Sequence, residues 1–273
     1  FLIIAIQSVL LRCSQAQVTL WADTPETASP GLSDLLKDGR VKLEVIDVET
    51  MALQLPEGII KSQVQEILQI AGTKSSLHHT SPIERSRSNL LRYMILYLHG
   101  GVYLDADTIV LKDLSTLNNA HSGYIGKENS VWAITRRGNP LHRFFWAPLL
   151  EVIRWLAVQF PRGYRWNAFF SALCSSSENN AVMGLTPHHT YLEKCFEYIS
   201  EMTQEEIVRP LRLGPFLLQR VAKKYKKLDI KTFPRKYFYP YGPLISQHFF
   251  KSRNNAQKVA NYMIASETHV IHW

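Results

Sequence analysis

The sequence predicts an α/β fold, from two observations on its apolar segments. Between residues 1 and 114, segments with the apolar spacing of helices alternate with short apolar segments typical of strands. A helical segment over 82–99 also leads, through two glycines, directly into a short apolar strand. Helix and strand in this order along the chain are characteristic of a sheet covered by helices.

The composition is that of a globular protein with one core. The chain has 273 residues, 46% of them hydrophobic, and we expect a single domain over residues 1–273. Its net charge of +8 fits a solvated basic surface, a groove for an anionic substrate, or a surface near acidic lipid. No compact basic motif with interleaved aromatic residues occurs, so nucleic acid is not an expected partner. The three cysteines have no metal-site spacing and no disulfide framework, although one bridge remains open.

The N-terminal elements are predicted from their apolar patterns. Residues 1–13 are an apolar run shorter than the ~20 residues that span a bilayer, and we expect an internal helix packed on a sheet. Strands are predicted at 18–21 and 42–48, and a helix at about 56–70. Because the chain does not begin with methionine, we expect its true N-terminus, with any membrane anchor, to lie outside it.

The helix before the glycines has start and stop signals. Ser81 is a candidate N-cap, Pro82 takes the first helical position, and Glu84 completes a capping box. Gly100 and Gly101 end the helix.

The second half has a looser pattern. Helices are predicted near 140–158, from Thr186 to about Met202, and from 213–215 to a lysine cluster at 223–227, with a Ser- and Asn-rich loop at 174–180. The histidines at 188 and 189 are expected at the surface. Residues 233–243 predict an aromatic, proline-rich loop, whose aromatic side chains at 237–241 suggest a rim for a sugar acceptor.

The segment 98–114 contains the most informative feature, the pair Asp105 and Asp107 at the end of an apolar strand. Side chains two apart on an extended strand share a face. Two such acids at a buried strand end cost free energy unless a positive partner holds them. Oxygen ligands suit magnesium and manganese, so we predict a metal site that carries phosphate. The alternative is an exposed turn.

Two enzyme chemistries place acids at this spacing after a strand. In phosphatases with an aspartyl nucleophile, the first acid attacks phosphorus and the second acts as acid and base. That class expects Thr or Val where this chain has Ile109, and a later acidic pair that is missing here. In glycosyl transfer from a nucleotide sugar, the acids hold a metal that neutralises the departing diphosphate.

Residues 87–114, RSNLLRYMILYLHGGVYLDADTIVLKDL, resemble the sugar-binding D-x-D region of glycosyltransferase family 32. Residues 1–21, 213–225, 233–243 and the closing VIHW are similar to segments of its α-1,4-glycosyltransferase branch. The resemblance implies a GT-A-type nucleotide-diphospho-sugar transferase fold, with a mixed sheet flanked by helices. It further implies a retaining enzyme that uses Mn²⁺ (or Mg²⁺) to move a hexose from a UDP-sugar to a glycan or glycolipid hydroxyl. Eukaryotic members act on the lumenal side of the Golgi membrane.

The same resemblance implies the site residues by position. Asp107 would bind the metal directly, and Asp105 would lie nearer the ribose and sugar. Arg92 would reach the donor sugar or diphosphate from its helix. His272 matches a late residue that can complete the metal shell, and Asn180 matches an asparagine beside the donor sugar.

Asn89 departs from the family pattern. Related chains have Ser-Asp-x-x-Arg on this helix, where this chain has Ser-Asn-Leu-Leu-Arg at 88–92. Asn89 keeps the hydrogen-bonding shape but lacks a charge that would contact the donor sugar, which fits altered donor choice, reduced turnover or an inactive enzyme. Gly101 is also expected at the donor, and a first strand that helps to bind the nucleotide is expected to be missing before residue 1.

Each residue also has an ordinary structural interpretation. Arg92 would then be a helix-surface arginine that pairs with Asn89 or Glu84. His272 would be a buried histidine in an aromatic-rich segment, and Asn180 a turn residue. The chain itself would be a non-catalytic relative that binds nucleotide or glycan.

Overall fold

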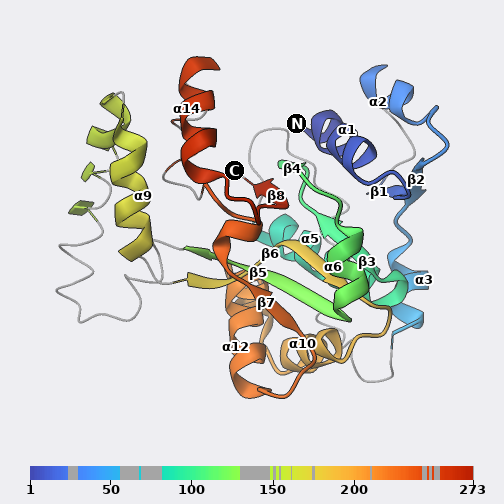
Figure 1. Cartoon of the computed structure of the whole chain (residues 1–273). Helices are drawn as coiled ribbons and strands as arrows, with labels where there is room; N and C mark the ends of the chain where they lie inside the picture. The colour runs from blue at the N-terminus through green and yellow to red at the C-terminus, as the bar shows by residue number, and fades with distance from the viewer. Residues whose placement is uncertain are drawn as a thin grey trace.

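The central element is a mixed four-stranded sheet (Figure 1). The computed structural model describes residues 1–23, 30–55, 68, 82–129, 148–149, 152–153, 155–160, 162–173, 176–209, 211–241, 245, 248 and 253–272. The sheet has the order β3 (Gly101–Leu104), β6 (Ser176–Leu185), β5 (Gly123–Asn129) and β7 (Lys231–Phe233). Strand β6 is antiparallel to both of its neighbours, whereas β5 and β7 are parallel.

Two smaller sheets flank this one. Strand β1 (Val18–Ala22) runs parallel to β2 (Val41–Val45). Strand β4 (Thr108–Val110) pairs antiparallel with β8 (Val270–His272), and the register places Thr108 opposite His272. This pairing brings a strand from late in the chain directly beside the acid pair.

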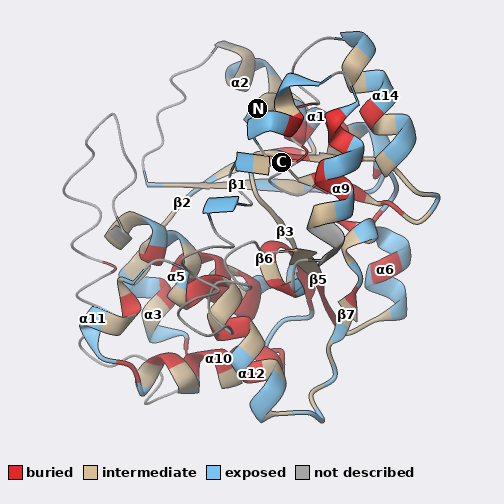
Figure 2. Cartoon of the chain, turned by 90° about the vertical axis from the view of Figure 1, so that its left-hand side faces the viewer, coloured by how far each residue is buried: buried red, intermediate tan, exposed pale blue. Residues whose placement is uncertain are grey.

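Helices cover both faces of the main sheet, because its side chains alternate between two cores. On one face, Ile125 and Met183 pack with α5 (Pro82–His99), α10 (Thr190–Ser200) and α12 (Leu217–Lys224), where Figure 2 shows many buried residues. On the other, Tyr124 and Val182 pack near α1 (Leu2–Arg12), α6 (Ser115–Ala120) and the segment around Phe238. The predicted α/β class is therefore confirmed.

A third cluster of buried residues joins α9 (Gly163–Leu173) and α14 (Arg253–Met263) to β8. The shorter helices are α2 (Pro30–Leu35), α3 (Val48–Leu53) and α11 (Gln204–Ile207), with a π-helical turn at Arg212–Phe216 and a 3-10 turn at Arg235–Tyr237. Within the described ranges, no helix combines the length and the hydrophobicity that crossing a bilayer requires.

Several predicted elements differ from the structure. The predicted Ser/Asn loop at 174–180 is wrong from residue 176 onward, because these polar residues begin the central strand β6. The strand predicted over 42–48 stops at Val45, since Asp47 caps α3 by accepting from the backbone N–H of Thr50. The predicted helix at 56–70 lies outside the described residues apart from Leu68, and only parts of the one at 140–158 lie inside them.

The expected aromatic rim is wrong for three of its four side chains, whereas the fourth, Tyr237, is half-buried and stacks on His269. Phe238, Tyr239 and Tyr241 are fully buried core residues, and the hydroxyl of Tyr239 accepts a hydrogen bond from the backbone N–H of Val182. His189, expected at the surface, is buried and caps the N-terminus of α10.

Candidate functional site

Asp105 and Asp107 lie in a tight turn between β3 and β4. The carbonyl oxygen of Asp105 accepts from the backbone N–H of Thr108 at 3.1 Å and from its hydroxyl at 2.8 Å. The backbone N–H of Asp105 donates to the carbonyl of Ala181 in β6, at 2.9 Å. The two acids therefore come together through a turn anchored to the sheet, and the predicted reason, a shared strand face, is wrong.

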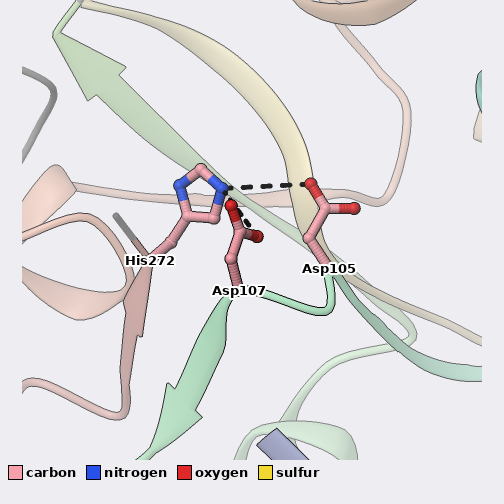
Figure 3. A group of neighbouring side chains, drawn as sticks. All are labelled: Asp105, Asp107 and His272. Atoms are coloured by element: carbon pink, nitrogen blue, oxygen red, sulfur yellow. Dashed lines mark ion pairs between the residues drawn. The ribbon is translucent and has the colours of Figure 1, made fainter. Parts of the chain in front are cut away.

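His272 completes a group of three possible metal ligands (Figure 3). Its Nε2 atom lies 3.5 Å from Asp107 Oδ1 and 3.9 Å from Asp105 Oδ2, and the possible ligand atoms of the three residues all lie within 4.8 Å of one another. The imidazole packs edge-on against the ring of Tyr239, with centroids 5.6 Å apart. Two carboxylates and one imidazole suit a hard divalent cation such as Mn²⁺ or Mg²⁺.

Arg92 reaches the acid pair from helix α5. Its guanidinium donates to Asp105 Oδ1 at 2.8 Å and to the carbonyl oxygen of Asn180, and it lies 4.2 Å from the ring centroid of Tyr103. Arg92 is 6% exposed. The helix-surface interpretation of Arg92 is therefore wrong, because the side chain is an internal cation that neutralises Asp105.

Asn180 and Asn89 form a fixed pair of amides. The Asn180 side-chain nitrogen donates to Asn89 Oδ1 at 2.6 Å and contacts the hydroxyl oxygen of Tyr93 at 3.2 Å. Asn180 is buried inside β6, so its interpretation as a turn residue is wrong. Burial raises the pKa of Tyr93, whose hydroxyl donates to the carbonyl of Leu213 at 2.5 Å and stays neutral.

A pocket of about 290 Å³ connects these groups. Its lining includes four of the predicted donor residues, Asn89, Arg92, Asp105 and Asn180. Asp105 thus borders both the pocket and the three-residue group with Asp107 and His272. Gly101 is not among the lining residues.

The family comparison agrees with this geometry. Residues 2–128, slightly less than half of the chain, match the family model described as a glycosyltransferase sugar-binding region containing a DXD motif. This part of the chain is therefore similar to a DXD-type glycosyltransferase region. The match includes α5 and the Asp105–Asp107 pair, and it confirms the resemblance to DXD-containing glycosyltransferases. The α/β architecture agrees with the GT-A-type fold expected for such a region.

Among solved structures, the chain is similar to the PaToxG glycosyltransferase, at 12% sequence identity and a TM-score of 0.49. The similarity covers 82% of this chain and 62% of that one, so the chain spans less than two thirds of that structure. No curated protein matches the sequence at a significant level.

Two of the arginines around the DXD pocket, Arg209 and Arg212, were not predicted from the sequence. Arg85, Arg209 and Arg212 line it together with Arg92, and Arg212 also pairs with Glu206 at 2.5 Å. Arg85 lies on α5 with Asn89, but the other two follow α11, in a segment with no recognisable motif. Their only sequence signal is proximity to the Gly-Pro segment at 214–215, which also lines the pocket.

Glu128 is a further residue near the acid pair that was not predicted. It accepts a hydrogen bond from the side chain of Asn179, and burial raises its pKa, while the nearby His272 opposes this rise. Glu128 ends up near the acid pair because β5 runs alongside β6, which no local sequence pattern could indicate.

Proposed function

We propose that this chain transfers a hexose from a nucleotide-diphosphate sugar, with UDP as the nucleotide, to a glycan or glycolipid hydroxyl, with retention of anomeric configuration. The observation that carries the proposal is the meeting of Asp105, Asp107 and His272 beside the pocket. These three residues would hold Mn²⁺ (or Mg²⁺), which when bound neutralises charge on the departing diphosphate.

The pocket supports placement of the sugar next to this group. At about 290 Å³ it is close to the lower limit of ordinary ligand sites, which suits a single sugar ring. The amides of Asn89 and Asn180 offer donors and acceptors for sugar hydroxyls, and Asp105 lies where the ring would meet the diphosphate. The lining arginines add a positive potential that attracts the anionic donor.

Arg92 has a positioning role as well as a binding role in this proposal. Through its bonds to Asp105 and to the backbone of Asn180, it holds one residue of the metal group and one of the pocket at a constant separation. Such positioning raises the rate because the reacting groups meet already oriented.

The test is calorimetric titration of UDP with and without Mn²⁺, on the wild-type chain and on Asp107→Ala. We expect Mn²⁺-dependent binding that is lost in the variant by at least about tenfold, because one carboxylate ligand has been removed. Asp34→Ala is the control, since Asp34 is an exposed acid paired with Lys37 and should leave binding unchanged. Equal UDP affinity with and without Mn²⁺ in folded wild-type protein would contradict the proposed metal-assisted donor site.

A second candidate is a non-catalytic nucleotide- or glycan-binding relative, and Asn89 is the residue that favours it. Its amide lies in the pocket, where the related pattern has an acid. Hydrolysis of UDP-sugars separates the two candidates. Mn²⁺-dependent UDP binding without release of sugar from any UDP-hexose would support the binding role.

A further inference from the structure

Helix α9 has large apolar side chains on two opposite faces. Tyr164 and Ala168 face inward and join the buried cluster with Val259 of α14 and Ile271 of β8. Trp166 and Phe169 are 53% and 63% exposed, and Arg162 and Arg165 are exposed with them. Positions 162, 165, 166 and 169 have the spacing of one helical face, so the outer face of α9 is aromatic and basic.

The helical residues before α9 extend this face. Large apolar side chains are exposed here too, at Leu149, Val152, Trp155, Leu156 and Phe160. The rings of Phe160 and Trp166 lie 5.5 Å apart, which joins the two segments. We call these five residues together with Trp166 and Phe169 the α9 surface. Single exposed apolar residues are ordinary, but a group of this size usually marks an interaction site.

The position of the α9 surface leaves it accessible. In Figure 1, α9 stands at the edge of the molecule beside α14, far from α3 on the opposite side. The contact with α14 is made by Tyr164, whose ring lies 5.5 Å from that of Tyr262, and by Arg165, whose guanidinium lies 5.3 Å from the centroid of the same ring. Trp166 and Phe169 remain exposed while the helix is attached to the fold.

The chemistry of the surface favours a membrane with acidic lipids over a protein partner. Trp and Phe side chains combined with arginine are typical of helices that lie in the headgroup region, and arginine is attracted to acidic lipid. Among the described residues of 148–173, the charged side chains are those of Arg162 and Arg165, so an approaching anionic surface meets attraction from these residues. The net charge of +8 also attracts an anionic membrane surface.

We propose that the α9 surface docks this chain on membranes that contain acidic phospholipids. Trp155, Trp166 and Phe169 enter the headgroup region, and Arg162 and Arg165 pair with lipid phosphates. Because the inner face of α9 packs on Ile271, the residue before His272, docking would hold the metal group near the membrane surface. The proposal does not depend on the transferase function.

The experiment is co-sedimentation of the full chain with vesicles of phosphatidylcholine alone or mixed with phosphatidylserine. We expect binding to the mixed vesicles, with a blue shift of tryptophan fluorescence, and a decrease as salt is raised. The combined variant Trp155→Ser, Trp166→Ser, Phe169→Ser should bind at least about tenfold more weakly, because it removes the apolar area that is buried. The pair Arg162→Gln, Arg165→Gln should lose about fivefold per arginine.

Leu53→Ser is the matched control, because Leu53 is 86% exposed on α3, away from the α9 surface. It should bind vesicles as the wild type does, and circular dichroism should show all variants folded. Absence of wild-type binding to the mixed vesicles, or equal binding by the aromatic variant, would overturn the proposal. A dimer in size-exclusion chromatography that the aromatic variant abolishes, without vesicle binding, would instead assign the surface to self-association.

Discussion

Arg92 connects three separate parts of the fold through one side chain. It belongs to helix α5, donates to the turn acid Asp105, and donates to the backbone of Asn180 in β6. The planar guanidinium can make both contacts at once because its donors point in fixed, divergent directions. A lysine has the same charge but presents a single ammonium group on a flexible stem.

We therefore expect Arg92→Lys to weaken both the fold and the site. Loss of one of two buried contacts should cost about 2 kcal/mol of unfolding free energy, part of the cost of breaking a buried pair. Urea denaturation measures this, and Mn²⁺-dependent UDP titration should show binding at least about tenfold weaker. Arg220→Lys is the matched control, since Arg220 is exposed on α12, where its guanidinium contacts the hydroxyl of Tyr198, and should lose little. Equal losses in both variants would deny Arg92 a special role.

The structure can be compared with the location that the sequence predicted for each site residue. The structure brings Asn89, Arg92, Asp105 and Asn180 to one pocket, and Asp107 and His272 next to it. Their roles with sugar and metal stay predictions. Gly101 lies outside the pocket lining, and its location at a helix end explains its presence without a ligand.

At the scale of elements, the junction between α5 and β3 is formed by two glycines, Gly100 and Gly101. Both glycines have positive φ, +65° at Gly100 and +92° at Gly101, a region that side chains disfavour. A Cβ atom on Gly100 would lie 2.5 Å from Cδ of Pro187, whereas one on Gly101 would meet nothing within 4 Å. The backbone at Gly100 therefore lies so close to Pro187 that no side chain fits between them.

The two alanine variants should therefore differ. Gly101→Ala should cost about 1–2 kcal/mol through backbone strain alone, and Gly100→Ala should cost about 2 kcal/mol more, through the clash with Pro187. The difference in unfolding free energy, measured in urea, checks this. If Gly101→Ala is the more damaging of the two, the packing argument is wrong.

Helix α10 begins with a histidine in place of the usual small polar cap. His189 Nδ1 accepts from the backbone N–H of Tyr191 at 3.1 Å, so its proton lies on Nε2, which donates to the carbonyl of Asp229 at 2.9 Å. The hydroxyl of Ser122 donates to Asp229 Oδ2 at 2.6 Å. This Ser–His–Asp group is therefore structural, because the imidazole has no lone pair available for the serine.

Burial lowers the pKa of His189 below its usual value, which makes stability depend on pH. Below about pH 6.5 the unfolded chain takes up a proton that the folded chain resists, so the unfolding free energy falls as pH falls. His189→Asn keeps an N-cap acceptor and removes the titration. We expect its unfolding free energy to fall less than that of the wild type between about pH 6.5 and 5; parallel curves would contradict this.

At the scale of the whole molecule, the site lies where separately formed parts of the fold meet. The pocket joins α5, the turn before β4, strand β6 and the segment before α12. The metal group adds β8, which is held by pairing with β4 and by the cluster with α9. Loss of the β4–β8 pairing would therefore also separate His272 from the acid pair.

The sequence could predict the parts of the site that lie close together along the chain. The helix at 82–99, the glycines and the acids form a local pattern, and local patterns are what apolar spacing and capping signals report. Strand β6 was missed because its first residues, Ser176 to Asn180, are polar, although the pairing of Ser176 to Asn179 with β5 makes this segment a strand. Tertiary pairing overrode local propensity there.

The aromatic segment at 233–243 was also misjudged from its composition. Here the composition suggested exposure, whereas the structure shows burial. A run rich in Pro and Tyr after β7 has the composition of a surface loop, yet Tyr239 and Tyr241 are buried among residues from distant parts of the chain. Arg209, Arg212 and Glu128 escaped prediction for a related reason: only the folded topology places them near α5 or the acid turn.

The pairing of β4 with β8 also has a consequence for biosynthesis. The acids of the turn leave the ribosome long before His272, so a nascent chain offers two carboxylates and no imidazole. The complete three-residue group can form only after β8 has emerged and docked against β4. Affinity for the proposed metal would then report that translation has passed residue 272, and a premature stop codon before β8 would yield a protein with the DXD pair but without His272.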